Sequence, residues 1–138
     1  MNALVPSWDR AGPGPGADID RTVLFTDDRI QTHYCDQRNP ETIRSLWARP
    51  ELRTLFDVII DDGLHTIEGN VTFLTGSLEH VRSGGLYVIE DIRAVDLDHW
   101  RAYIGEHQRR YPGHEIALVQ LPNAANRFDN NLLIIRPH

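Results

Sequence analysis

Cysteine, long apolar runs and an excess of positive charge are all scarce or missing in this sequence. The single cysteine, Cys35, excludes an internal disulfide and fits a reducing compartment. No apolar run approaches the roughly 20 residues of a membrane-spanning helix, and no apolar signal-peptide core is found at the N-terminus. The formal net charge of -6 argues against a nucleic-acid partner held mainly through its phosphates. We therefore expect a cytoplasmic protein that binds neither a membrane nor a nucleic acid.

A glycine-rich cofactor loop is also missing. Residues 12–16, Gly-Pro-Gly-Pro-Gly, have the GxGxG spacing of such a loop. However, no confident strand precedes them, no helix pattern follows, and their prolines donate no N–H to a ligand. We interpret residues 1–22 as an irregular segment or linker, and residues 23–138 as one α/β domain of ordinary globular composition.

The centre of this domain is the stretch from Phe56 to Ile92. Two short apolar runs, Val58–Ile60 and Leu86–Ile89, have the continuous hydrophobicity of strands that are covered on both faces. Between them, apolar residues recur at steps of four and three, which predicts a helix with one buried side. Its expected inner residues are Ile67, Val71, Leu74, Leu78 and Val81. The pattern predicts a strand, a helix and a second strand.

Each apolar run ends in carboxylates, Asp61 and Asp62 after the first and Glu90 and Asp91 after the second. A right-handed crossover makes the strands parallel, and neighbouring strands lie about 4.8 Å apart, so these carboxylates should meet at one sheet edge. Such crowding is unfavourable unless protons or a cation neutralise it, and hard oxygen ligands suit a divalent ion such as magnesium. The alternative is a simple turn at Asp61-Asp62-Gly63 and a cap at Glu90-Asp91.

A histidine, His65, follows the first acidic pair, with Thr66 as the expected N-cap of the helix. It stands three residues after Asp62, so it can lean over the same site and take a proton near neutral pH. The alternative is a loop histidine whose only role is a hydrogen bond.

The flanking segments predict the remaining elements. Strands are expected at Val23–Phe25 and Ile30–Tyr34, with a polar turn between them. Asn39 and Pro40 should cap and open a helix, and a later helix should follow the polar connection 93–98 and stop near Gly113. The last two strands, Ile116–Leu121 and Leu132–Ile135, are expected to pair antiparallel across the loop Pro122–Asn131.

The motifs FDVIIDDGLH and GGLYVIEDI, separated by one helix, resemble the core of the class I S-adenosylmethionine-dependent methyltransferases. More narrowly, they resemble the metal-dependent sugar O-methyltransferases of macrolide tailoring, of the mycinamicin and macrocin type, with relatives labelled cephalosporin hydroxylase. The likeness covers roughly residues 27 to 135. It implies a Rossmann-like, mostly parallel sheet with a C-terminal antiparallel hairpin, truncated at the N-terminus.

The resemblance also implies site residues. It implies magnesium, or another divalent cation, held by Asp62, Glu90 and Asp91, with His65 as the base that deprotonates a substrate hydroxyl. The segment CDQRNP implies Asp36 and Gln37 near the adenine of S-adenosylmethionine, and Asp61 facing the methionine end of this cofactor. One departure is Leu64, which stands where the family usually has serine.

A second departure concerns the front of the domain. In the family, the first strand carries the glycine loop and lies beside the strand at 57–61, and the second strand ends in the acid that holds the ribose. Without them, Val58–Ile60 would lie at a bare sheet edge. Residues 1–9 or 22–26 could cover that edge, a second copy could do so as a homo-oligomer, or the sequence could be part of a longer enzyme.

The expected function is metal-assisted methyl transfer to a hydroxyl of a sugar or another natural-product acceptor. The main alternative is a catalytically inactive remnant that serves as a binding or assembly module, which the missing glycine loop favours. A metal-dependent hydrolase or oxygenase is weaker, because facial-triad oxygenases need two histidines and only His65 stands at the expected site.

Overall fold

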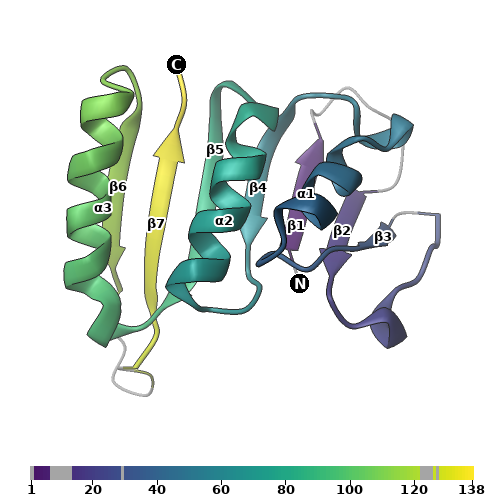
Figure 1. Cartoon of the computed structure of the whole chain (residues 1–138), viewed down its shortest axis with the longest axis horizontal. Coiled ribbons are helices and arrows are strands. Elements are labelled where there is room, and N and C mark those ends of the chain that lie inside the picture. Colours follow the sequence, from purple (N-terminus) through teal and green to yellow (C-terminus); the bar gives the residue numbers. More distant parts are fainter. Residues whose placement is uncertain (1, 7–13, 29, 122–125, 127) are drawn as a thin grey trace.

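The computed structural model describes residues 2–6, 14–28, 30–121, 126 and 128–138. They form a 7-stranded sheet in the order β3-β2-β1-β4-β5-β7-β6. Helices α1, α2 and α3 all lie on one face of this sheet (Figure 1). The strands are β1 (Asn2–Pro6), β2 (Gly14–Asp18), β3 (Ile30–Tyr34), β4 (Phe56–Asp61), β5 (Val81–Ile92), β6 (Glu115–Gln120) and β7 (Asn131–Arg136), and the helices are α1 (Pro40–Trp47), α2 (Ile67–Ser77) and α3 (Leu97–Arg110).

The strand directions confirm the expected fold class. β2 pairs parallel with β3, and β4 pairs parallel with β5. β1 is antiparallel to both of its neighbours, and β7 is antiparallel to β5 and β6. All strands except β1 and β7 therefore run in one direction, and the chain ends in the predicted antiparallel hairpin.

The N-terminal segment differs from the irregular linker expected over residues 1–22. Asn2–Pro6 and Gly14–Asp18 are strands, and β1 lies between β2 and β4 in the middle of the sheet. Leu4 pairs with Ile59 and Val5 with Val58, so β4 is no sheet edge. Of the alternatives weighed for that edge, the N-terminal residues cover it, and a second copy is not required there. Gly12 and Pro13 of the glycine-proline tract lie outside the described residues.

The strand expected at Val23–Phe25 is wrong. Arg21–Val23 form a 3-10 turn that the Asp20 side chain caps, and only an isolated bridge from Thr26 to Gln31 follows. The side chains of Val23 and Phe25 are exposed, so they lack the packing that would hold a strand. The second expected strand, Ile30–Tyr34, is confirmed as β3.

Local signals at α1 are confirmed. Asn39 accepts a hydrogen bond from the Glu41 N–H, and Pro40 is the first helical residue. The inner face of α1 is buried, as predicted, and consists of Ile43, Leu46 and Trp47. The Trp47 Nε1 donates to the Ser77 Oγ at 3.0 Å, which joins α1 to α2.

The α2 helix begins at the predicted N-cap and ends earlier than its apolar pattern. Thr66 accepts from the Gly69 N–H, but the α-helix stops at Ser77 and Val81 opens β5. Leu74 and Phe73 are the most buried apolar residues of α2.

No described helix is both long and apolar enough to cross a membrane.

The core lies between the helices and one face of the sheet. Register places Ile59, Tyr87 and Ile135 in one cross-strand row, and all three are fully buried. The residues next to them, Ile60 and Val88, point to the opposite face and are half-buried. In the C-terminal hairpin, β6 and β7 are confirmed, whereas residues 122–125 and 127 of their connection lie outside the described residues.

Candidate functional site

The acidic pairs meet at the carboxyl edge of the sheet, as predicted. β4 and β5 are parallel, and Asp61 is the register partner of Ile89, immediately before Glu90. The first acidic pair therefore lies beside the second, and the loop after β4 carries His65 to the same edge before α2 begins.

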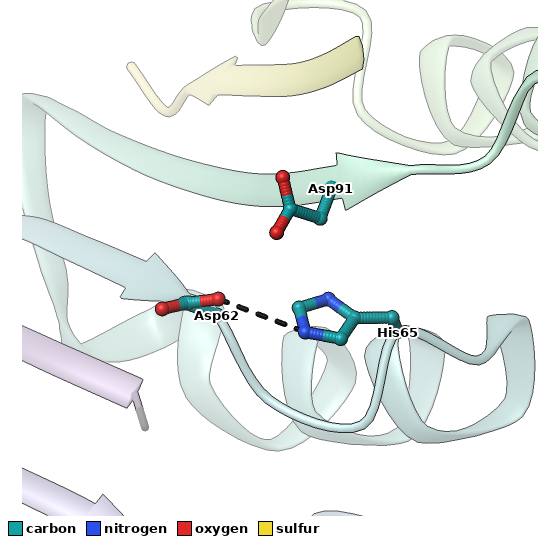
Figure 2. A group of neighbouring side chains, drawn as sticks. All are labelled: Asp62, His65 and Asp91. Carbon is teal, nitrogen blue, oxygen red and sulfur yellow. Dashed lines mark ion pairs between the residues drawn. The ribbon is translucent and has the colours of Figure 1, made fainter. Parts of the chain in front are cut away.

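Three side chains from this edge converge on one position. Asp62, His65 and Asp91 each offer one potential ligand atom, and these atoms lie within 4.8 Å of one another. His65 Nε2 is 3.7 Å from Asp62 Oδ1. Figure 2 shows Asp91 reaching from β5 toward the ring of His65, which faces Asp62 from the loop after β4. All three residues are half-buried, so they remain open to a ligand.

The backbone at this cluster is strained. His65 and Asp91 have φ angles of 50° and 51°, and no other non-glycine residue in the described part of the chain has a positive φ. Left-handed backbone costs about 1 to 3 kcal/mol at a non-glycine residue and tends to occur at functional sites. Two of the three converging residues carry this strain, which marks the cluster as more than a solvated turn.

Glu90 lies near this cluster but outside it. Burial raises the pKa of Glu90, and the negative charges of Asp62 and Asp91 raise it further. Its carboxylate is therefore within electrostatic range of both aspartates, although it does not share their common position. The structure thus brings together Asp62 and Asp91 with His65, whereas the sequence had grouped the two aspartates with Glu90.

Asp61 has different surroundings from Asp62. It is fully buried, and its two carboxylate oxygens accept from Gln37 Nε2 and Asn70 Nδ2, each at 3.0 Å. Burial raises the pKa of Asp61 to about 6, although both amide hydrogen bonds oppose the shift. Gln37 Oε1 also accepts from the Leu64 N–H at 2.7 Å. This network joins β4, α2 and the loop that carries His65.

Asn70 escaped the sequence analysis. It lies on the inner side of α2, where it is buried among apolar residues. A polar residue on the buried stripe of a helix requires a partner. A polar residue on the predicted buried side of this helix therefore indicated a buried hydrogen-bond partner, which is Asp61.

A small cavity lies next to this network. It has a volume of about 210 Å³ and is bounded by the ends of β2 and β3 and by the loop after β4. Its lining residues are Ala17, Asp18, Ile19, Cys35, Gln37, Gly63 and Leu64. Of the predicted cofactor residues, Gln37 lines the cavity and Asp61 is hydrogen-bonded to Gln37. Asp36 does not line it and instead forms an ion pair with Arg38 at 3.1 Å.

Asp18 is a second residue that sequence reasoning missed. It ends β2 and lies at the same cavity. The signal was hidden because the glycine-proline tract that forms β2 was interpreted as a linker. A larger cavity of about 600 Å³ lies between α2 and α3, but none of the predicted site residues lines it.

The sequence is similar to several O-methyltransferases, although no protein-family model matches it. It is 40% identical over 88 residues to demethylmacrocin O-methyltransferase of Streptomyces fradiae, a match that covers 64% of this chain and 20% of the relative. It is 38% identical over 119 residues to L-olivosyl-oleandolide 3-O-methyltransferase of Streptomyces antibioticus, a match that covers 84% of this chain and 29% of the relative. The chain therefore spans less than a third of the length of these curated relatives.

Solved structures show the same fold. MycE methyltransferase from the mycinamycin biosynthetic pathway, in complex with Mg, SAH and mycinamycin VI, superposes with a TM-score of 0.59 at 23% identity, over 89% of this chain and 36% of that chain. An O-methyltransferase from Bacillus cereus in complex with SAH superposes with a TM-score of 0.57 at 13% identity, over 79% and 51%. These likenesses confirm the Rossmann-like methyltransferase fold.

Proposed function

We propose, from the premise that this chain is similar in sequence to macrolide sugar O-methyltransferases and has the methyltransferase fold, that it methylates a hydroxyl of a glycosylated small molecule with S-adenosylmethionine. The observation that carries the proposal is the convergence of Asp62, His65 and Asp91 at one sheet edge. Ligands of open α/β sheets bind beyond the carboxyl ends of the strands, where this cluster lies.

The cluster fits a divalent cation. Asp62 and Asp91 supply hard carboxylate oxygens, which are the ligands that magnesium prefers, and their repulsion falls when a cation lies between them. We assign the cation to these two aspartates, with Glu90 beside them. When bound, a divalent cation lowers the pKa of a hydroxyl on the acceptor.

We assign His65 as the base. Its Nε2 faces Asp62, and its Nδ1 is buried without a hydrogen-bond partner among the described residues. Because the buried Nδ1 is out of reach of a substrate, we assign the substrate proton to Nε2, which lies 3.7 Å from Asp62 Oδ1 at the sheet edge.

We assign the methyl donor to the edge of the sheet where the neighbouring cavity of about 210 Å³ lies. We assign Asp18, at the end of β2, to the ribose side, because it lines this cavity together with Gln37. Asp61 accepts a hydrogen bond from Gln37, and we assign it to the side of the site that would face the methionine end of the cofactor. Asp36, paired with Arg38, stays a candidate for the adenine side. S-adenosylmethionine supplies the sulfonium methyl group.

A catalytically inactive module is the second candidate. The observation that favours it is the direction of β1, which lies beside β4 but runs antiparallel to it. Because β1 is antiparallel, its amino end lies at the edge where β4 and β5 have their carboxyl ends. The loop that follows β1 therefore leaves from the opposite edge and cannot bind a cofactor beside the acidic cluster. Such a module would hold the acceptor or a partner without transferring a methyl group.

Calorimetry separates the two candidates. We expect S-adenosylmethionine to bind the whole chain, and the methyl group to reach a glycosylated macrolide only when Mg²⁺ is present. Asp62→Asn should abolish Mg²⁺-dependent turnover, whereas Asp28→Asn, at an exposed position on the β3 side, should not change it. Absence of cofactor binding would favour the inactive module, and full activity of Asp62→Asn would remove the metal role.

A further inference from the structure

The cavity of about 600 Å³ between α2 and α3 lies at the opposite end of β5 from the acidic cluster. Val81 and Ser83, at the start of β5, line this cavity, whereas Asp91 lies near the end of the strand. Figure 1 shows α2 and α3 on the same face of the sheet. The proposed methyl transfer makes no use of this cavity, although three of its lining residues are histidines: His107, His114 and His138.

Two of these histidines are in direct contact. His107 Nε2 and His114 Nδ1 are 3.0 Å apart. One ring donates an N–H and the other accepts, so at least one nitrogen directs a lone pair at its neighbour. His107 comes from the last turns of α3, where it is buried, and His114 immediately precedes β6. Two separate segments therefore bring imidazole nitrogens to one position.

The surrounding backbone and rings hold this pair in place. The Tyr111 N–H donates to the His107 carbonyl at 2.8 Å, and the His114 N–H donates to the Tyr111 carbonyl at 3.0 Å. The rings of Tyr111 and His114 are stacked, with centroids 5.0 Å apart and planes inclined by 7°. A ligand of the pair would therefore meet imidazoles that are already oriented, which lowers the entropic cost of binding.

The separation of the two nitrogens fits a shared metal ion. A zinc–imidazole bond is about 2.0 to 2.1 Å long, so nitrogens 3.0 Å apart would subtend an angle of about 90 to 100° at the ion. A widening to about 3.4 Å would give the tetrahedral angle that zinc prefers. Imidazole nitrogens suit Zn²⁺, Ni²⁺ and Cu²⁺, whereas Mg²⁺ prefers oxygen ligands. The pair therefore differs in metal preference from the aspartates of the acidic edge.

The other polar groups of the cavity are compatible with a cation. Glu79 and Glu106 line it, and Arg110 is the one arginine in its lining. Both glutamate side chains are exposed, so they can turn without leaving the core. Among the described residues, no third histidine, cysteine or carboxylate shares the position of the pair. Water, or a rotated side chain of Glu106 or His138, would complete the coordination.

We propose that His107 and His114 bind a transition-metal ion such as Zn²⁺, which joins the end of α3 to the start of β6. This site is separate from the acidic edge and does not depend on the proposed methyl transfer. An ion that binds the folded chain and not the unfolded chain raises the stability of the fold. Zinc should therefore stabilise the connection between α3 and β6.

Zinc calorimetry on the whole chain at pH 7.5 tests this site. The background is the double variant Asp62→Asn, Asp91→Asn, which lacks the carboxylates of the acidic edge. We expect it to bind one Zn²⁺ per chain, and a further His107→Gln or His114→Gln to weaken zinc binding at least about tenfold, as for the loss of one strong ligand. The matched control is His99→Gln, which removes an exposed histidine of α3 that does not line the cavity.

Two further measurements do not depend on the heat of binding. Zn²⁺ should raise the unfolding temperature of the background and of the His99→Gln control, but not that of the His114→Gln variant. In nitrogen NMR spectra of the background, Zn²⁺ should shift the ring nitrogens of His107 and His114. This spectrum decides the question if His107→Gln does not fold, because it needs no change at the buried ring.

Several results would overturn the site. These are the absence of zinc binding in the background, zinc binding that His114→Gln leaves intact or that His99→Gln weakens equally, and ring-nitrogen shifts confined to other histidines. The proposed function is tested separately by S-adenosylmethionine binding and Mg²⁺-dependent turnover, so either proposal can fail while the other stands.

Discussion

Asp61 and Asp62 are neighbours in the sequence, yet they have opposite roles in the structure. Asp61 points inward, where two amide groups hold it, and Asp62 points to the edge, where it faces His65. Adjacent residues at a strand end point to opposite sides, so one acidic pair can supply both a buried support and an open ligand. The Asp61 carboxylate therefore holds the loop in place from inside, and the Asp62 carboxylate is the one that can bind a ligand at the edge.

Asp61 should make stability depend on pH. Its folded pKa of about 6 is above the ordinary value of 3.8, so the folded protein binds this proton more tightly than the unfolded chain does. The free energy of unfolding should therefore fall as pH rises through the interval from about 4 to about 6, by about 2 to 3 kcal/mol from this residue. Urea unfolding of wild type and Asp61→Asn at pH 4 and pH 7 measures it.

The difference in unfolding free energy between wild type and Asp61→Asn isolates the contribution of Asp61 from that of the other carboxylates. Asp61→Asn should lose the pH-dependent part, while Asp28→Asn should behave as the wild type. Parallel pH profiles for wild type and Asp61→Asn would show that the buried carboxylate does not titrate in this range.

His65 should affect rate more than affinity. Removal of a general base typically lowers turnover by about 10² to 10⁴, whereas His65 does not line the small cavity that we assign to the cofactor. We expect His65→Ala to lower kcat by that factor and to leave the Kd for S-adenosylmethionine within about twofold. An unchanged kcat would reject His65 as the base, and a lost cofactor affinity would assign it to binding.

Metal affinity should rank the carboxylates. The side chains of Asp62 and Asp91 converge with His65, whereas Glu90 lies outside this group. Asp91→Asn should therefore weaken Mg²⁺ binding much more than Glu90→Gln. We expect a loss of at least about tenfold for Asp91→Asn, which corresponds to one strong ligand, and a smaller loss for Glu90→Gln. Titration calorimetry measures both, and equal losses would place Glu90 in the ligand set that the sequence resemblance implied.

At the scale of elements, α1 and α2 depend on close contact at a glycine. A Cβ at Gly76 would lie 2.7 Å from the Ile43 Cγ2, so the two helices approach each other only because this position has no side chain. Ile43 is fully buried and cannot turn away easily. The α1 and α2 helices together cover the sheet beside the acidic edge, so this contact supports the loop that carries His65.

Gly76→Ala and Gly105→Ala should change stability in opposite directions. Both glycines lie in helices, where alanine gains about 1 kcal/mol of helix propensity. At Gly105, in α3, the nearest atom to a new Cβ is 3.7 Å away, so the gain should appear as higher stability. At Gly76 the clash should outweigh it and destabilise the protein by about 1 to 2 kcal/mol.

Denaturant midpoints at equal m-values measure both glycine effects. A gain in stability for Gly76→Ala would show that α1 and α2 are packed more loosely than the Ile43 contact indicates. A loss for Gly105→Ala would place an unexpected neighbour against α3.

Elements were predictable where the signal was local. The Asn39-Pro40 start of α1 and the Thr66 cap of α2 follow from side chains that bond their own backbone neighbours, so both helices were found. Val23–Phe25 failed because a strand depends on pairing along its length and on packing, whereas Phe25 bonds to the single residue Thr32 and both Val23 and Phe25 are exposed. The early end of α2 at Ser77 was missed because Leu78 and Val81 continue the helical pattern in a 3-10 turn and a strand.

At the scale of the whole molecule, the N-terminal strands were beyond sequence reasoning. β1 pairs with β4, more than fifty residues later, and its five residues give too short a pattern to reveal that partner. The acidic edge was predictable in contrast, because the crossover between β4 and β5 follows from the rule for parallel strands. The convergence of Asp62, His65 and Asp91 was not predictable, since it depends on the left-handed backbone at Asp91 and His65.

Removal of residues 1–6 should loosen the sheet at its centre. β1 is the strand that joins β2 and β3 to the rest, so its loss leaves an apolar edge at β4. We expect hydrogen exchange of the Val58–Ile60 amides to accelerate and the shortened chain to self-associate, while amides of the β6–β7 hairpin stay protected. Unchanged protection of β4 would show that β1 contributes little to the fold.

The central claim, a divalent cation held by Asp62 and Asp91 beside His65, is tested most directly by paramagnetic Mn²⁺ in a backbone NMR spectrum. Substoichiometric Mn²⁺ should first broaden the amides of residues 62–65 and 90–92, because broadening falls steeply with distance from the ion. The same addition to Asp62→Asn should leave these resonances sharp. Broadening centred on other exposed carboxylates, or equal broadening in the variant, would contradict the account.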